Sequence, residues 1–99
     1  MNYKELEAVE FKQHLESEHK QLLVDVREEY EFEETNIGGI NIPMGEVLSR
    51  INDLKDNQSV YLCCRSGKRS KAIALHLAKH LDQCQIYSLK GGIIAYQEI

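Results

Sequence analysis

No run of apolar residues in this chain approaches the roughly 20 that a membrane-spanning helix needs. The first ten residues, MNYKELEAVE, have no basic region followed by an apolar stretch, so they do not resemble a secretion signal. The three cysteines are an odd number and do not predict a disulfide framework, which favours reduced thiols. We therefore expect a cytoplasmic protein that makes no contact with a membrane.

Low-complexity tracts, linkers and internal repeats are absent as well. The 99 residues, of which 42% are hydrophobic and 28% charged, suffice for one hydrophobic core but not for two. We expect residues 1–99 to form a single domain that folds on its own.

Negative charge predominates overall, but the charges are unevenly distributed. The net charge is −4, whereas residues 1–59 carry −8 and residues 60–99 carry +4. Arg65, Lys68, Arg69 and Lys71 fall within seven consecutive positions, which predicts a loop that attracts a small anion. Because the rest of the surface is acidic and no aromatic residues interleave with these cations, we do not expect nucleic acid as a partner.

Strand and helix patterns alternate along the chain. The apolar runs 21–26, 59–64 and 84–89 predict buried strands, and the glycines and single proline of 37–43 predict a loop with a brief strand. Apolar residues at helical spacing predict helices over 6–16, 44–54 and 70–81. The acidic segment 27–34, which follows the first apolar run, predicts a helical turn. Such alternation predicts an α/β fold with a mostly parallel sheet, in which ligands bind beyond the carboxyl ends of the strands.

Two adjacent cysteines end the strand predicted at 59–64. Side chains alternate across a strand, so Cys64 shares a face with Val60 and Leu62, whereas Cys63 shares one with Tyr61. Alternation alone does not choose between them, but Cys64 stands at the junction with the basic loop. A helix N-terminus, backbone amides and nearby cations all favour a thiolate, so we predict that Cys64 is the nucleophile and that Cys63 is a buried core residue.

Four segments resemble, in order, the successive motifs of rhodanese-like domains: LLVDVREEYEF, NIGGINIP, VYLCCRSGKRS and LKGGIIAY. The resemblance covers nearly the whole chain and implies a five-stranded, mostly parallel sheet flanked by helices on both faces. It also implies a sulfurtransferase. In such an enzyme Cys64 would take a sulfane sulfur as a persulfide from thiosulfate or another donor and pass it to cyanide, a thiol or a sulfur-carrier protein.

The resemblance also assigns roles to other residues by motif position. The loop that would cradle the persulfide with its backbone amides comprises Arg65, Ser66, Gly67, Lys68, Arg69 and Ser70. Within it, Arg65, Lys68 and Arg69 would attract the anionic donor. Asp25 and Arg27 are expected to form a buried ion pair that fixes the strand end, and Gly91 and Gly92 to shape the loop beside the site. Neither a metal nor another cofactor is implied.

Two departures from the family pattern leave the nucleophile in place. Asn36 and Gly38 replace a histidine and a proline that many members have, and Tyr96 stands where tryptophan is common. The NIGGINIP form is similar to the rhodanese-like domain appended to adenylyltransferases that activate ubiquitin-like sulfur carriers. That similarity makes a sulfur-relay protein or such a carrier a candidate partner.

Other functions compete with this interpretation. Cysteine phosphatases of the related fold have five residues between cysteine and arginine, whereas Cys64 and Arg69 enclose four, and the same spacing disfavours an arsenate reductase. A zinc site formed by His76, His80 and the three cysteines is disfavoured because adjacent strand cysteines point in opposite directions. His14 and His19 are expected at the surface. A persulfide carrier without turnover, or a protein-interaction module, remains an alternative.

Overall fold

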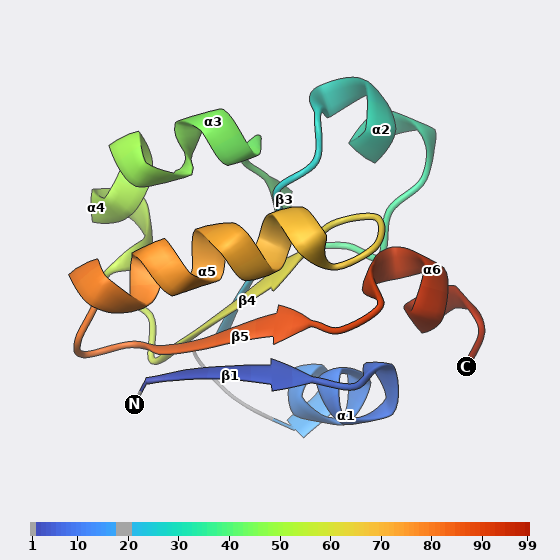
Figure 1. Ribbon diagram of the computed structural model, residues 1–99, viewed down its shortest axis with the longest axis horizontal. Coiled ribbons are helices and arrows are strands. Elements are labelled where there is room, and N and C mark those ends of the chain that lie inside the picture. The colour runs from blue at the N-terminus through green and yellow to red at the C-terminus, as the bar shows by residue number, and fades with distance from the viewer. Residues whose placement is uncertain (1, 18–20) are drawn as a thin grey trace.

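A parallel β-sheet runs through the computed structural model, which describes residues 2–17 and 21–99 (Figure 1). Within these residues the sheet has five strands in the order β1-β5-β4-β2-β3, and every pair of neighbours is parallel. The predicted mostly parallel, five-stranded sheet is therefore confirmed. The strands are β1 (Tyr3–Leu6), β2 (Gln21–Asp25), β3 (Ile40–Asn41), β4 (Ser59–Cys63) and β5 (Gln85–Leu89).

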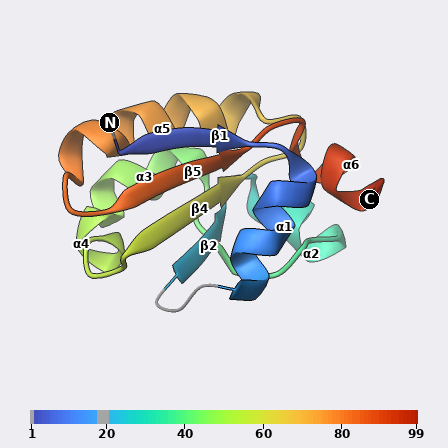
Figure 2. The ribbon, with the colours of Figure 1, turned by 90° about the horizontal axis from the view of Figure 1, so that it is seen from below.

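Helices cover both faces of this sheet. Helix α5 packs with α3 and α4 on one face, and α1 lies on the other, as Figure 2 shows. Helices α2 and α6 lie at the edge toward which the strands point, where ligands bind in parallel α/β sheets (Figures 1 and 2). The helices are α1 (Ala8–Ser17), α2 (Glu29–Glu34), α3 (Met44–Val47), the 3-10 turn η1 (Leu48–Arg50), α4 (Ile51–Leu54), α5 (Lys68–His80) and α6 (Gly92–Gln97).

The central strand β4 is buried along its whole length and separates two hydrophobic clusters. Val60, Leu62 and Cys64 belong to the larger cluster, under α5, whereas Tyr61 and Cys63 belong to the cluster under α1. The alternation predicted from the sequence is thus confirmed. It places the two adjacent cysteines on opposite faces of the sheet.

Several elements differ from the sequence predictions. Strand β1 and helix α6 were not predicted, and the helix expected over 44–54 is divided by η1, with Arg50 at φ −113° and ψ 25°. His14, expected at the surface, is half-buried, and its Nδ1 lies 3.0 Å from the Tyr61 hydroxyl. His19 lies outside the described residues. None of the helices in 2–17 and 21–99 has the length and apolar character needed to cross a bilayer.

Candidate functional site

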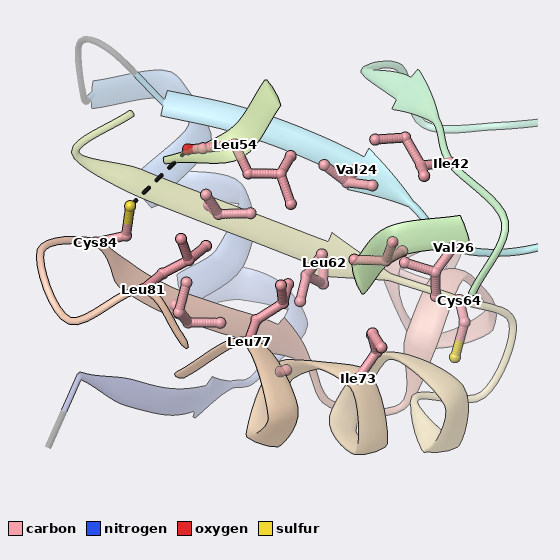
Figure 3. Close-up of a cluster of buried hydrophobic side chains, with 14 residues drawn as sticks. Val24, Val26, Ile42, Leu54, Leu62, Cys64, Ile73, Leu77, Leu81 and Cys84 are labelled. Carbon is pink, nitrogen blue, oxygen red and sulfur yellow. Dashed lines mark hydrogen bonds between the residues drawn. The ribbon is translucent and has the colours of Figure 1, made fainter. Parts of the chain in front are cut away.

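Cys64 follows the last residue of β4, at the carboxyl edge of the sheet. Only 1% of the residue is exposed, and its side chain closes the end of the larger hydrophobic cluster, beside Val26 and Ile73. Figure 3 shows it at the N-terminal end of α5. The strand therefore delivers this thiol to the point where the basic loop begins.

Two backbone N–H groups point at the sulfur. The amide of Gly67 donates to Cys64 Sγ over 3.1 Å and that of Ser70 over 3.4 Å, while the thiol itself lies 3.6 Å from the Ser70 hydroxyl oxygen. Both donors lie within the predicted persulfide loop, residues 65–70, and the binding of a persulfide by this loop stays a prediction. Both donors belong to the start of the 13-residue helix α5, whose dipole adds positive potential there.

Glycines allow the loop to close tightly over helix α6. Gly67 caps α5 with φ +98°, and a Cβ there would lie 3.0 Å from the carbonyl oxygen of Leu89. Gly92 has φ +65°, and a Cβ there would collide with the carbonyl oxygen of Arg65. The expected role of this glycine beside the loop thus has a steric basis.

The first turn of α6 also holds the backbone of Cys64 and of the residue that follows it. The amide of Ile93 donates to the carbonyl of Cys64 over 2.9 Å, and that of Ile94 to the carbonyl of Arg65 over 3.2 Å. Gly91 begins this turn at φ +77°. The glycine pair predicted a loop and helix α6 was not predicted, although the apolar IIAY segment that follows the glycines was a usable sign of it.

The cations of the loop do not behave alike. Arg65 and Lys68 are exposed, as is Ser66, and neither cation is ion-paired within the described part of the chain. Arg69, which was expected to meet the donor, instead donates to both carboxylate oxygens of Glu31 over 2.9 and 3.1 Å. This pairing holds the pKa of Glu31 at about 2, with further stabilisation from the Glu28 amide.

Glu31 is a site residue that sequence reasoning missed. It is one of several glutamates in α2, and 38 positions separate it from Arg69 in the chain. The opposite charges of the two halves of the sequence were the only available sign of a contact between them.

The predicted buried ion pair between Asp25 and Arg27 is confirmed. Asp25 is fully buried and Arg27 is 5% exposed, with Nη2 of Arg27 2.8 Å from Oδ2 of Asp25. The hydrogen bond to Asp25 raises the pKa of Arg27, and Arg27 also donates to the carbonyl of Thr35 over 2.7 Å. Because Asp25 pairs in register with Cys63, the ion pair fixes the strand end next to the basic loop that follows Cys64.

A cavity of about 390 Å³ opens between α2 and α6 beside this loop. Arg65, the residue after Cys64, forms part of its wall, whereas Cys64 itself does not line it. Its other lining residues are Arg27, Tyr30, Glu31, Glu34, Thr35, Ile93, Ile94 and Gln97.

The remaining cysteines are placed differently from Cys64. Burial raises the pKa of Cys63, and the charge of Asp25 raises it further, so this thiol stays protonated. Cys84 lies at the opposite end of the core, where its thiol points at the carbonyl oxygen of Leu54, 3.9 Å away (Figure 3), and also donates to the carbonyl of Asn57 over 3.0 Å. Among residues 2–17 and 21–99, no three histidine, cysteine or acidic side chains are grouped to hold a metal ion.

Comparison with known proteins agrees with this geometry. The family model described as "Rhodanese-like domain" matches residues 7–99. The chain is 40% identical over 76 residues to "Putative sulfur carrier protein YrkF" of Bacillus subtilis, matching 76% of this chain and 41% of that protein. It is 33% identical over 99 residues to "Adenylyltransferase and sulfurtransferase MOCS3" of Drosophila persimilis, matching 92% of this chain and 22% of that protein.

A solved structure shows the same fold. The rhodanese-related protein of Thermoplasma volcanium superposes with a TM-score of 0.81 at 26% identity, covering 97% of this chain and 92% of that one. The chain spans less than half the length of either YrkF or MOCS3. The matched family model, together with the strand order and the cysteine loop, shows that this chain belongs to the rhodanese-like domain family.

Proposed function

We propose that this domain is a sulfurtransferase in which Cys64 accepts a sulfane sulfur as a persulfide and passes it to a nucleophilic acceptor. The observation that carries the proposal is the position of Cys64 Sγ, 3.1 and 3.4 Å from the amides of Gly67 and Ser70 at the start of α5. Membership of the rhodanese-like family and relatives named for sulfur transfer support it.

The chemistry that fits these contacts is a double displacement. With thiosulfate as donor, the Cys64 thiolate attacks the outer sulfur, the S–S bond breaks, and sulfite leaves with the bonding electron pair. The persulfide that forms is more acidic than a thiol and carries a negative charge at neutral pH. Its terminal sulfur, one atom beyond Sγ, lies within the field of the α5 amides, which stabilise it as donors in an oxyanion hole stabilise an oxyanion.

Acceptors reach the persulfide, in this proposal, through the cavity between α2 and α6. A thiolate or cyanide attacks the outer sulfur, and Cys64 leaves as a thiolate, which restores the enzyme. Neither step needs a proton to be removed from carbon, oxygen or nitrogen, so no general base is required. A sulfur-carrier protein remains a candidate partner, because relatives named as a sulfur carrier and as an adenylyltransferase match this chain.

The contact between Arg69 and Glu31 favours sulfur transfer over phosphatase activity. A cysteine phosphatase needs its loop arginine to hold the phosphate, whereas the guanidinium of Arg69 donates from Nη1 and Nη2 to a carboxylate. The four-residue spacing between Cys64 and Arg69 points in the same direction. The cytoplasmic location expected from the sequence stays a prediction.

Steady-state kinetics with thiosulfate and cyanide test the proposal. Double displacement predicts parallel lines in double-reciprocal plots, and Cys64→Ser should abolish turnover while the circular dichroism spectrum stays unchanged. If the domain were only an interaction module, neither the wild type nor the Cys64→Ser variant would show turnover. Turnover that survives in the Cys64→Ser variant would contradict the assignment of the nucleophile.

A further inference from the structure

The guanidinium of Arg69 already has an anionic partner before any donor arrives. Both oxygens of Glu31 accept from it, and Oε1 of Glu31 also accepts the backbone N–H of Glu28 over 3.0 Å. The Glu31 side chain is 18% exposed. The carboxylate is thus held from two directions, and its negative charge offsets the positive charge that Arg69 could offer to an anion.

Glu31 lines the cavity that, in the proposed function, leads reactants to Cys64. It lines the same cavity as Arg65, the cation that follows Cys64. An anion in that cavity therefore meets a fixed negative charge as well as the positive charge of Arg65. The repulsion grows in proportion to the charge of the donor, whereas the attraction of Arg69 is offset by its partner.

On the basis of the proposed function, we propose that Glu31 is a specificity-determining residue: as the resident counterion of Arg69, it disfavours small dianionic sulfur donors relative to donors of lower charge. Thiosulfate is the dianion of this class. Methanethiosulfonate, CH3SO2S⁻, presents the same kind of S–S bond with one negative charge, and attack by Cys64 on its outer sulfur releases methanesulfinate. The two donors therefore differ chiefly in charge and provide a matched pair.

The decisive variant is Glu31→Gln, with Glu34→Gln as control. Glutamine keeps an oxygen that can accept the Glu28 amide, so the start of α2 is preserved while the charge is removed. Glu34 belongs to the same helix and lines the same cavity, but within the described residues it forms no ion pair. The control removes an equal charge without releasing Arg69.

Binding is measured without any transfer step in a Cys64→Ser background. Thiosulfate and methanethiosulfonate are titrated at low ionic strength while the amide resonances of Gly67 and Ser70 are followed by NMR. Loss of one negative charge changes the Coulomb energy of a bound dianion twice as much as that of a monoanion, so the fold-change in the dissociation constant of thiosulfate should be about the square of that of methanethiosulfonate. At higher salt, where exposed charges are screened, both effects should shrink.

The expected result is that Glu31→Gln lowers the dissociation constant of thiosulfate more than that of methanethiosulfonate, while Glu34→Gln has a smaller effect. Unchanged or weaker thiosulfate binding would overturn the proposal, as would equal effects of the two variants. When Cys64 is retained, Glu31→Gln should raise kcat/KM for thiosulfate by a factor similar to the gain in binding. Tighter binding without transfer by any of these proteins would overturn the proposed function and leave the counterion role of Glu31 standing.

Discussion

Replacing Gly92 by alanine should damage both the stability of the domain and the reactive loop. At φ +65° an L residue adopts the left-handed conformation at a cost of about 1–2 kcal/mol. The added Cβ would also collide with the carbonyl oxygen of Arg65 and lie 2.6 Å from that of Cys64. Both atoms belong to backbone, so relief requires the loop or α6 to move, and overpacking of this kind costs about 1–3 kcal/mol more.

Two other glycines separate these contributions. Gly38, at φ +105°, has open space where a Cβ would lie, with nothing within 4 Å, so Gly38→Ala should show the conformational cost alone. Gly45 lies in α3 with equally open surroundings and no positive φ, and Gly45→Ala should stabilise the protein by about 0.5–1 kcal/mol. Gly92→Ala should therefore lose about 2–5 kcal/mol in total.

Urea denaturation of the three variants measures these differences, and the rate of sulfur loading reports on the loop. We expect the order of stability Gly45→Ala, wild type, Gly38→Ala, Gly92→Ala, with slower loading only in the last. If Gly92→Ala were no less stable than Gly38→Ala and loaded sulfur normally, the close approach of α6 to the loop would have no energetic importance.

Two further predictions concern the ion pairs of the site. Asp25→Asn leaves the buried Arg27 without its counterion and should lower the free energy of unfolding, measured by urea denaturation, by about 3–5 kcal/mol. Asp25→Asn combined with Arg27→Met should lower it less, because no unpaired charge stays buried. Equal losses in the two proteins would contradict the pairing. Glu31, whose pKa falls from 4.5 to about 2 on folding, contributes stability that is fully present above about pH 4.5 and is lost as the pH falls toward 2. The stabilities of wild type and Glu31→Gln, compared from pH 6 to 2, should therefore converge at low pH, and a constant difference would contradict the pKa.

The sequence was most informative where a segment is buried on both sides. The runs at 21–26, 59–64 and 84–89 stand out because parallel strands covered by helices need continuous apolar residues. Strand β1 lacks this signal, since it lies at the sheet edge and includes Lys4 and Glu5. Its place is fixed by pairing with β5, more than 80 residues later in the chain, which local pattern does not reveal.

The place of the candidate nucleophile in the fold could be predicted, but its surroundings only in part. The position of Cys64 follows from strand alternation and the basic loop, both of which are local properties. The choice of Ser70 as an amide donor depends on how tightly Gly67 turns, and the partner of Arg69 depends on where α2 comes to lie. The half-buried position of His14 likewise depends on Tyr61, a contact between distant segments.

Intact mass spectrometry after incubation with thiosulfate tests the central claim most directly. The account predicts that the protein gains one sulfur atom, that cyanide removes it, and that Cys64→Ser gains none. The Cys63→Ser variant is the matched control, and it should load normally because that side chain lies on the opposite face of the sheet. A folded, reduced protein that gains no sulfur, or one that gains it at Cys63, would contradict the account.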